Sequence, residues 1–344
     1  MCQHGLGLEF PIRIISFGFF FPRIGRDTTL RAMSSVSGLF TVRICPTCAS
    51  TELDSAWRIG SEPPGETMSF AELQDSWHGF FKNRKLFFTY RRRASCGLVY
   101  SPVYFTAEQL AELYRLMDDN TAGVSAGVLT KTQRGYFNLL RSLAAIPAGG
   151  GYLELGPDIG SFTREAMGAI DFAHYWMVEP NLEVHGALGE LLRGREYSLL
   201  SDDSQLEEVP DKSISAVVAI HVIDHLRDPR ARLEQLHRKL KHGGVIFLVL
   251  HNQQSMMARF FGRRWPPYCL QHPQIFAPSS VTDILERAGF QVVQVRATVN
   301  HFPIMYLLRH FLFGVGIGRV PLPELAWWTV GLRLQNIAVA GRKL

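Results

Sequence analysis

The chain has 344 residues, of which 47% are hydrophobic and 19% are charged, and its formal net charge is +5 at pH 7. This composition excludes a disordered or fibrous protein, and the length is enough for one large domain or two smaller ones. The arginines are dispersed apart from short runs at 91–93 and 263–264, so the charge does not indicate a nucleic acid partner.

Cysteine content and hydropathy bear on the compartment. Five cysteines in a chain of this size form no dense, even framework, which favours a reduced, cytoplasmic setting. No apolar run reaches the roughly 20 residues that a transmembrane helix needs. We therefore expect no transmembrane segment, while peripheral contact with a membrane surface stays open, and the sequence does not indicate an oligomeric state.

The first 32 residues alternate phenylalanine, glycine and arginine with no helical or strand period. Met33, followed by two serines, offers an alternative start. We expect residues 1–32 to be an extension outside the folded unit, either non-native or disordered.

A Cys-x-x-Cys pair marks the next segment, over residues 33–104. Cys45-Pro-Thr-Cys48 is followed by a polar stretch and then by Cys96-Gly97. In a zinc ribbon, two such pairs point four thiolates at one tetrahedral zinc ion. The segment thus resembles the small zinc ribbon that precedes many bacterial class I methyltransferase domains, and the resemblance implies these three cysteines as metal ligands.

The second pair of this ribbon is incomplete. Arg93 stands where the resemblance implies a cysteine, and His78 or Cys2 is available as a fourth ligand. The alternative is a degenerate ribbon that binds no metal, because three thiolates alone do not close a structural zinc site.

Residues 105–150 are predicted to form a helical cover. Thr106 is suited to cap a first helix, and leucines recur after it at helical spacing. A second apolar stripe runs from Tyr136 to Leu143. Such stripes usually pack in a core, and Pro147 with the glycines at 149–151 ends the helical region.

The stretch from Gly151 to Ile170 reads as a buried strand, a tight turn and a helix. Apolar residues flank the single acid, Glu154, as in a parallel strand that is covered on both faces. Gly156 and Gly160 then allow a ligand to approach the backbone, and Ser161 is the expected N-cap of the helix. The stretch therefore predicts a site for a nucleotide-like cofactor.

Two cofactor classes use such a turn. A dinucleotide fingerprint requires Gly-x-Gly-x-x-Gly, but Asp158 and Ser161 occupy its second and third glycine positions here. The pattern of Glu154, Gly156 and Gly160 instead resembles the first motif of class I S-adenosylmethionine-dependent methyltransferases, with Asp158 in place of the usual middle glycine. The resemblance implies that these four residues bind S-adenosylmethionine.

The next two predicted strands each end in acids. Glu179 ends a buried strand. In such folds an acid ~20 residues after the turn meets a ribose diol, and Glu179 has this spacing. A third strand, 197–200, leads to Asp202 and Asp203. In the resembled family an acid in this loop commonly meets the adenine amino group, and the choice between the two stays open.

A fourth strand, 214–220, runs into His221-Val-Ile-Asp224-His225 and then an Asp-Pro helix start. This run again resembles class I methyltransferases. Strand ends in open parallel sheets line the ligand crevice, so His221, His225 and also His251, after the fifth strand, are placed to meet an acceptor. Histidine suits proton abstraction near neutral pH, and we assign His225 first and His221 second as the catalytic base.

The remainder completes an alternating pattern of strands and helices over residues 151–344, with insertions at 253–278 and 301–330. Long aromatic and basic connections such as 253–278 are often substrate lids. The whole predicts a Rossmann-like, doubly wound α/β sheet of about seven strands with a small N-terminal cysteine-containing ribbon and a helical cover.

The sequence therefore predicts an S-adenosylmethionine-dependent methyltransferase. The aromatic connection and the apolar insertion favour a small or amphipathic acceptor, such as a sugar, a lipid-linked glycan or a natural product. One alternative is a non-catalytic interaction module on a degenerate methyltransferase fold. A nicotinamide-dependent oxidoreductase is a further alternative that the glycine pattern disfavours.

Overall fold

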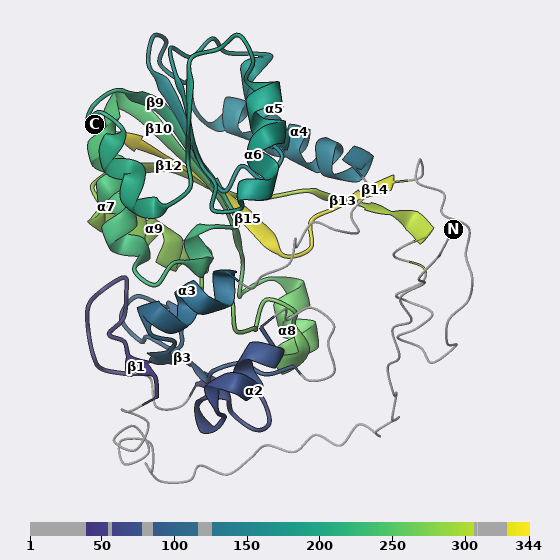
Figure 1. The fold of residues 1–344 in the computed structure, drawn as a ribbon. Coiled ribbons are helices and arrows are strands. Elements are labelled where there is room, and N and C mark those ends of the chain that lie inside the picture. Colours follow the sequence, from purple (N-terminus) through teal and green to yellow (C-terminus); the bar gives the residue numbers. More distant parts are fainter. Residues whose placement is uncertain (1–38, 54–56, 78–84, 116–125, 306–307, 309–328) are drawn as a thin grey trace.

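The computed structural model describes residues 39–53, 57–77, 85–115, 126–305, 308 and 329–344. These residues form two parts that lie against each other, a larger one built on a sheet, which we call the sheet layer, and a smaller one, which we call the smaller layer (Figure 1). Residues 1–32, Cys2, His78 and most of the insertion at 301–330 lie outside the described residues. Within the described part, no helix is both long and apolar enough to cross a bilayer.

A seven-stranded sheet forms the larger layer, and its strand order is β12-β15-β10-β9-β6-β7-β8. The strands from β10 to β8 run parallel, whereas β15 is antiparallel to both of its neighbours. The strands are β6 (Gly151–Leu155), β7 (Tyr175–Val178), β8 (Tyr197–Leu200), β9 (Ile214–Ile220), β10 (Leu240–His251), β12 (Phe290–Ala297) and β15 (Asn336–Lys343).

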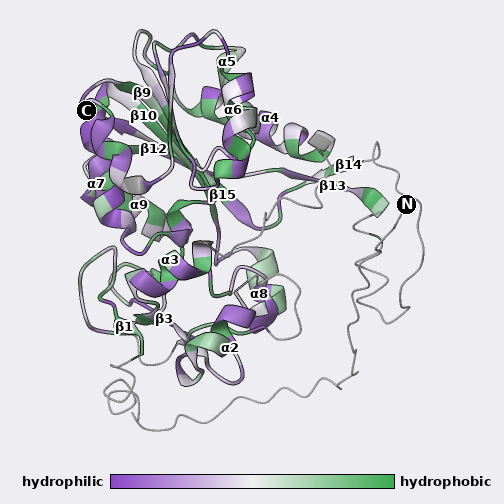
Figure 2. Cartoon of the chain, viewed as in Figure 1, coloured by the Kyte–Doolittle hydropathy of each residue, from purple (hydrophilic) through white to green (hydrophobic). Residues whose placement is uncertain are grey.

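Helices cover both faces of this sheet (Figure 1). One face packs with α4 and α5 in one apolar cluster, and the other packs with α7 and α9 in a second cluster. The strands are apolar along their length while the outward helix faces are polar, as a sheet buried on both sides requires (Figure 2). These helices, with α6 beside α5, are α4 (Ala126–Leu143), α5 (Ser161–Met167), α6 (His185–Leu191), α7 (Pro229–Lys239) and α9 (Pro278–Arg287). The predicted doubly wound α/β fold is confirmed.

The smaller layer contains the described residues of 39–104, which we call the cysteine segment. A four-stranded sheet in the order β11-β4-β3-β2 and a two-stranded ribbon of β1 and β5 organise it. Its elements are β1 (Thr41–Val42), β2 (Arg58–Ile59), η1 (Gly65–Thr67), α2 (Phe70–Asp75), β3 (Tyr90–Arg92), β4 (Val99–Tyr100) and β5 (Val103–Tyr104), and α3 (Ala107–Arg115) follows. Phenylalanines, tyrosines and Trp77 fill its core.

The connection at 253–278 is part of this smaller layer. It carries α8 (Met256–Phe261) and η5 (Gly262–Arg264), and its strand β11 (Gln274–Ile275) pairs with β4. Trp265 and Tyr268 are fully buried against the cysteine segment. The middle of the connection therefore packs as core, while α8 keeps Met256 and Phe260 exposed to solvent.

One local prediction, the N-cap of α5, differs from the structure. The N-cap is Gly160, and Ser161 is the first helical residue, because the left-handed backbone at Gly160 (φ +74°) sets the start of the helix. α9 begins at Pro278 with Ala277 as N-cap. β10 begins at Leu240, because the chain crosses Gly243 and Gly244 as an irregularity within the strand.

The apolar insertion is described only at its ends. β13 (Asn300–Pro303) pairs antiparallel with β14 (Thr329–Leu332), and this hairpin base packs beside α4.

Glu154 lies inside the fold, beneath the turn that follows β6. Its side chain is 2% exposed, and one carboxylate oxygen accepts hydrogen bonds from the hydroxyls of Tyr152 (2.6 Å) and Thr163 (2.5 Å). Burial raises the pKa of Glu154 to about 7, although the two hydroxyl donors oppose the shift. The acid thus joins strand β6 to helix α5.

This raised pKa predicts a specific pH dependence of stability. The unfolded chain ionises Glu154 near pH 4.5 and the folded chain near pH 7, so wild-type stability falls as the pH rises between these values. In Glu154→Gln, the amide oxygen still accepts both hydroxyl bonds and this loss disappears. We expect the variant to gain about 3 kcal/mol relative to wild type between pH 4 and pH 8, measured by chemical denaturation.

Glu286→Gln, at an exposed helix position, is the matched control and should follow the wild type at every pH. Parallel pH profiles of wild type and Glu154→Gln would contradict the assigned pKa.

Candidate functional site

The turn between β6 and α5 is built from three residues with left-handed backbone. Gly156 (φ +64°), Asp158 (φ +52°) and Gly160 (φ +74°) all lie in the region that favours glycine. Asp158 therefore takes up the backbone conformation available to a glycine, so its replacement of the usual middle glycine leaves the turn intact. A Cβ at Gly156 would lie 2.8 Å from Val222 Cγ2, which shows how closely the turn approaches the chain after β9.

Glu179 ties this turn to the end of the neighbouring strand β7. One carboxylate oxygen accepts a hydrogen bond from the amide of Asp158 (2.9 Å), and the other accepts from the amide of Asn181 (2.9 Å). His185 Nε2 donates to the carbonyl of Glu179 (2.8 Å). Burial raises the pKa of the Glu179 carboxyl, and the two amide donors oppose the shift.

The third strand of this group, β8, ends beside β7 and leads to Asp202. Its side chain caps the short helix η3 (Asp203–Glu208) by accepting from the amide of Ser204 (2.6 Å). Hydrogen bonds from the amide and from the hydroxyl of Ser204 lower the pKa of Asp202. Because β6, β7 and β8 are parallel neighbours, the glycine turn, Glu179 and Asp202 follow one another along the carboxyl edge of the sheet.

The roles predicted for Glu154, Gly156, Asp158, Gly160, Glu179, Asp202 and Asp203 in binding the cofactor stay predictions. The geometry nevertheless fits a nucleoside-type group. The glycine turn at the end of β6 packs closely against Val222 and Leu191, and a carboxylate with spare lone pairs stands at the end of β7. Glu154 differs from the others, since it faces Tyr152 and Thr163 inside the fold.

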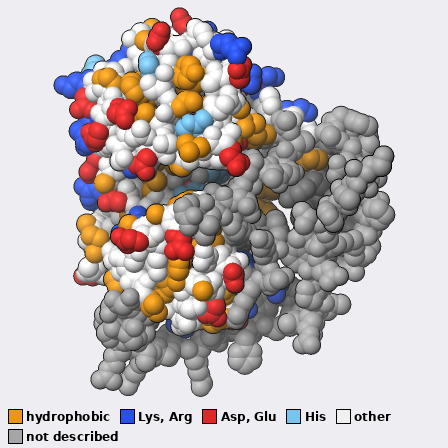
Figure 3. Space-filling model, viewed as in Figure 1, with side chains coloured by type: hydrophobic (Ala, Val, Ile, Leu, Met, Phe, Trp, Pro, Cys, Tyr) orange, Lys and Arg blue, Asp and Glu red, His pale blue; other side chains and the backbone are white. Residues whose placement is uncertain are grey.

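Four histidines and one aspartate gather at the ends of β9 and β10. We call this group the histidine cluster, and its members are His221, Asp224, His225, His251 and His272. Histidine side chains are visible along the line where the sheet layer meets the smaller layer (Figure 3). The structure thus brings the predicted His221 and His225 together with two histidines from later in the chain.

Asp224 is the centre of this cluster. It lies in the short helix η4 (Ile223–His225), has no exposed surface, and its Oδ2 accepts a hydrogen bond from His251 Nδ1 at 2.7 Å. Burial alone would raise the pKa of Asp224, but the bond from His251 and the surrounding histidines hold it well below its usual range. Asp224 is therefore an ionised carboxylate inside the protein.

The histidines of the cluster differ in their surroundings. Burial lowers the pKa of both His221 and His225 to about 3, which keeps these two rings neutral. His272 lies against the thiol of Cys269, with its Nδ1 3.3 Å from Sγ. Burial opposes a charge on His272, but Cys269 and Asp224 raise its pKa to about 9. His221 has left-handed backbone (φ +55°), and the centroid of its ring lies 4.6 Å from that of the His251 ring, with the two rings tilted by 39°.

Sequence reasoning did not select His272, Cys269 or the pairing of Asp224 with His251. His225 and His272 are 47 positions apart, yet their Nε2 atoms lie 3.1 Å from each other. No spacing in the sequence connects the two positions. The pairing of β11 with β4 brings the later histidine to the strand ends.

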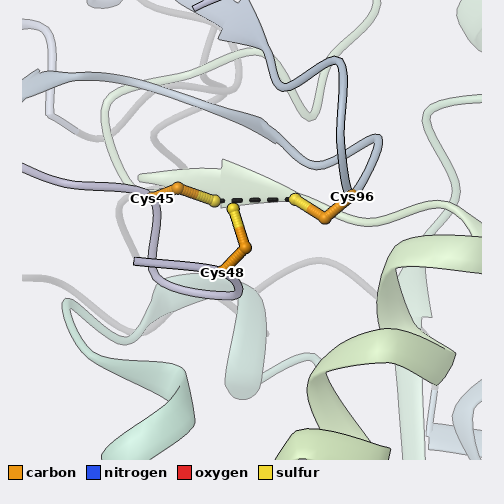
Figure 4. A group of neighbouring side chains, drawn as sticks. All are labelled: Cys45, Cys48 and Cys96. Atoms are coloured by element: carbon orange, nitrogen blue, oxygen red, sulfur yellow. Dashed lines mark hydrogen bonds between the residues drawn. The ribbon is translucent and has the colours of Figure 1, made fainter. Parts of the chain in front are cut away.

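The three cysteine thiols of the smaller layer converge as the ribbon resemblance implies (Figure 4). Cys45 Sγ lies 3.6 Å from Cys96 Sγ, and all three sulfurs lie within 4.8 Å of one another. The hydrogen bond with Cys96 lowers the pKa of Cys45. The metal role of Cys45, Cys48 and Cys96 stays a prediction, and both suggested fourth ligands lie outside the described residues.

The two cysteine turns have the same backbone form. The amide of Ala49 donates to the carbonyl of Cys45, and the amide of Gly97 donates to the carbonyl of Arg93, each at 2.9 Å. Both donor residues have left-handed backbone. Arg93 thus occupies the position in the second turn that Cys45 occupies in the first, and its side chain is 2% exposed.

A comparison with protein families gives a match for part of the chain. Residues 129–295 match the model of a family described as a methyltransferase domain. No curated protein sequence matches the chain.

Among solved structures, the chain is similar to an S-adenosylmethionine-dependent methyltransferase from Mesorhizobium loti, with 14% identity, a TM-score of 0.43, and coverage of 61% of this chain and 98% of the other. A candidate methyltransferase from Bacillus halodurans gives 16% identity, a TM-score of 0.45, and coverage of 60% and 98%. The [4+2]-cyclase SpnF gives 14% identity, a TM-score of 0.47, and coverage of 70% and 97%. At these identities and scores the three structures add nothing to the assignment of function.

The matched region runs from α4 through the strands from β6 to β12, and it includes the glycine turn and all five residues of the histidine cluster. Through these residues, which are just under half of its length, the chain is similar to the methyltransferase domain family, and it has the Rossmann-like sheet that the resemblance to class I S-adenosylmethionine-dependent methyltransferases implies.

Proposed function

We propose that the protein transfers a methyl group from S-adenosylmethionine to a small or amphipathic acceptor. The observation that carries this proposal is the arrangement along one edge of the sheet. The glycine turn, Glu179 and Asp202 follow the ends of β6, β7 and β8, and the histidine cluster follows the ends of β9 and β10. If the cofactor binds at the ends of β6, β7 and β8, the acceptor next to it binds at the ends of β9 and β10.

The bound cofactor supplies an already activated methyl group. The chain's own residues hold it: the backbone at Gly156 and Gly160 allows close approach, and Glu179 accepts from the ribose hydroxyls. Asp202 or Asp203 faces the adenine amino group. Methyl transfer is an in-line displacement, so positioning and exclusion of water contribute much of the rate.

The acceptor loses a proton where the methylated atom carries one. His225 and, second, His221 are the assigned proton acceptors, because they stand at the end of β9 next to the glycine turn. The aromatic connection at 253–278 and the apolar insertion at 301–330 favour a sugar, a lipid-linked glycan or a natural product. Nucleic acid is not indicated, and the compartment predicted from the cysteine content is the cytoplasm.

One observation favours a second candidate function. Both carboxylate oxygens of Glu179 already accept hydrogen bonds from backbone amides, so the carboxylate has a structural role without any cofactor. This supports a non-catalytic interaction module on the methyltransferase fold. Binding of S-adenosylmethionine separates the two.

We expect the purified protein to bind S-adenosylmethionine in isothermal titration calorimetry. Glu179→Gln removes the charge but keeps an oxygen acceptor, and we expect about tenfold weaker binding, equivalent to about 1.4 kcal/mol. Glu183→Gln, at an exposed position four residues away, is the control and should bind like wild type. No binding to wild type at millimolar cofactor would favour the interaction module.

The catalytic assignment predicts a separation of binding from transfer. His221→Ala combined with His225→Ala should abolish radiolabelled methyl transfer into host extracts and leave cofactor binding within about threefold of wild type, because the histidines face the acceptor. His242→Ala, at an exposed position in β10, is the control. Full transfer by the double variant would refute the assignment of the base.

We also propose that Cys45, Cys48 and Cys96 bind one zinc ion. Three converging thiols and two matched turns support it, whereas Arg93 at the fourth position supports the metal-free alternative. Cys45→Ser combined with Cys48→Ser should remove the zinc that elemental analysis detects in wild type and lower the melting temperature, because metal binding is coupled to folding. Fewer than about 0.2 cysteine-dependent zinc ions per chain would exclude this site.

A further inference from the structure

The histidine cluster has the composition of a metal site that is separate from the three cysteines. Within the described residues, one nitrogen or oxygen from each of Asp224, His225 and His272 lies within 4.8 Å of the other two. We propose that these three side chains bind a divalent transition-metal ion of the Zn²⁺ class. Metal binding at these residues is a proposal beyond methyl transfer. Only what it implies for the acceptor rests on the proposed function.

The distance between the two imidazoles is the first argument. The Nε2 atoms of His225 and His272 lie 3.1 Å apart. Two nitrogens at about 2.0–2.1 Å from one tetrahedral ion lie about 3.3–3.4 Å from each other. The two rings therefore already have nearly the spacing of two ligands to one ion, and little movement is required to admit it.

The hydrogen bond on the far side of His272 is the second argument. Its Nδ1 lies 2.7 Å from the carbonyl of Pro267. A carbonyl can only accept, so Nδ1 carries the hydrogen and donates it. A metal-bound histidine in proteins almost always donates its other N–H in this way. Metal binding requires that Nε2 lose its proton, and the lone pair of Nε2 is then free for the ion on the side of His225.

The third argument is the unsatisfied oxygen of Asp224. This side chain has no exposed surface, and His251 occupies Oδ2, yet Oδ1 has no hydrogen-bond partner among the described residues. A polar oxygen that is buried without a hydrogen-bond partner is costly. A cation coordinated by Oδ1 removes that cost, and His251 then acts as the outer partner that orients the carboxylate.

A second set in the cluster, His221 with Asp224 and His251, also lies within 4.8 Å. We prefer the first set, because an ion there replaces the 3.1 Å bond between His225 and His272, whereas an ion in the second set breaks the shorter, 2.7 Å bond between the carboxylate and His251. His221 Nε2 is also the acceptor of a 3.3 Å bond from Asn336. The two sets are distinguished by substitution of His272, which belongs only to the first.

Two histidines and one carboxylate leave a coordination position open, as in catalytic zinc sites with three protein ligands. Oxygen donors are good ligands for such an ion, so the proposal predicts an acceptor that offers a hydroxyl or a carboxylate near the methylated atom. It also changes the role of His225 from proton acceptor to ligand. Loss of transfer in the His221→Ala and His225→Ala double variant fits either role, so metal content has to be measured directly.

The test uses the full-length protein without a histidine tag, in the Cys45→Ser and Cys48→Ser background that removes the cysteine site. The protein is stripped with chelator, titrated with Zn²⁺ or Co²⁺, desalted and analysed for metal. We expect about one ion per chain. The Co²⁺ form should show visible bands of a tetrahedral ion without the thiolate charge-transfer absorption that cysteine ligands give.

His272→Gln and Asp224→Asn should each lower retained metal at least tenfold, and His242→Gln, the exposed control, should leave it unchanged. Because His272 is buried, circular dichroism checks that each variant is folded. If His272→Gln does not fold, His225→Gln replaces it, since the His225 side chain is only half-buried. Equal metal retention by the background protein and by folded ligand variants would overturn the proposal, as would no retention by any of them.

Calorimetry with S-adenosylmethionine on the same samples separates the two proposals. Loss of metal with cofactor binding retained supports the metal site. Retained metal in a background protein that does not bind the cofactor supports the metal site and defeats the proposed methyl transfer. Loss of metal in His221→Gln with normal retention in His272→Gln overturns the assignment of the ligands.

Discussion

The ionised carboxylate of Asp224 is the constraint on which the site depends. A charge with no exposed surface requires partners, and the fold provides them from three separate parts of the chain. His251 comes from the end of β10, and His225 follows Asp224 in η4. His272 comes from the connection that joins the two layers. The position of Asp224 therefore requires that β9, β10 and the connection meet at one point, and the proposed function puts the acceptor there.

The glycine turn, where we propose that the cofactor binds, depends on a second buried carboxylate. Glu179 is nearly buried, and it satisfies its charge with two backbone amides, one of them in the glycine turn. The left-handed backbone at Asp158 orients that amide toward the carboxylate. This explains how an aspartate is accepted where a glycine is usual: the turn needs the backbone conformation, and the bond from its amide to Glu179 offsets the strain of about 1 kcal/mol. The two carboxylates thus fix neighbouring parts of one edge of the sheet.

The order of strands and helices was predictable from sequence because a sheet buried on both faces leaves a strong apolar signal. β8 and β9 have the predicted bounds, and the turn, Glu179 and the run from His221 to His225 lie at strand ends as predicted. Local backbone geometry was less predictable: the N-cap of α5 fell on Gly160 instead of Ser161. His272 could not be predicted as a site residue, since its place depends on the pairing of β11 with β4, between strands far apart in the sequence.

The pairing of β11 with β4 also connects the cysteine segment to η4 by hydrogen bonds. Arg43, beside the first cysteine turn, donates to the carbonyl of Arg227 at 2.7 Å and to the side-chain oxygen of Gln274 at 2.8 Å. Gln274 in turn donates to the carbonyls of Asp224 and Leu226, at the helix that carries the buried carboxylate. These bonds form a short, largely buried path from the cysteine turns to Asp224. The cysteine segment thus supports η4, and through η4 it supports the histidine cluster.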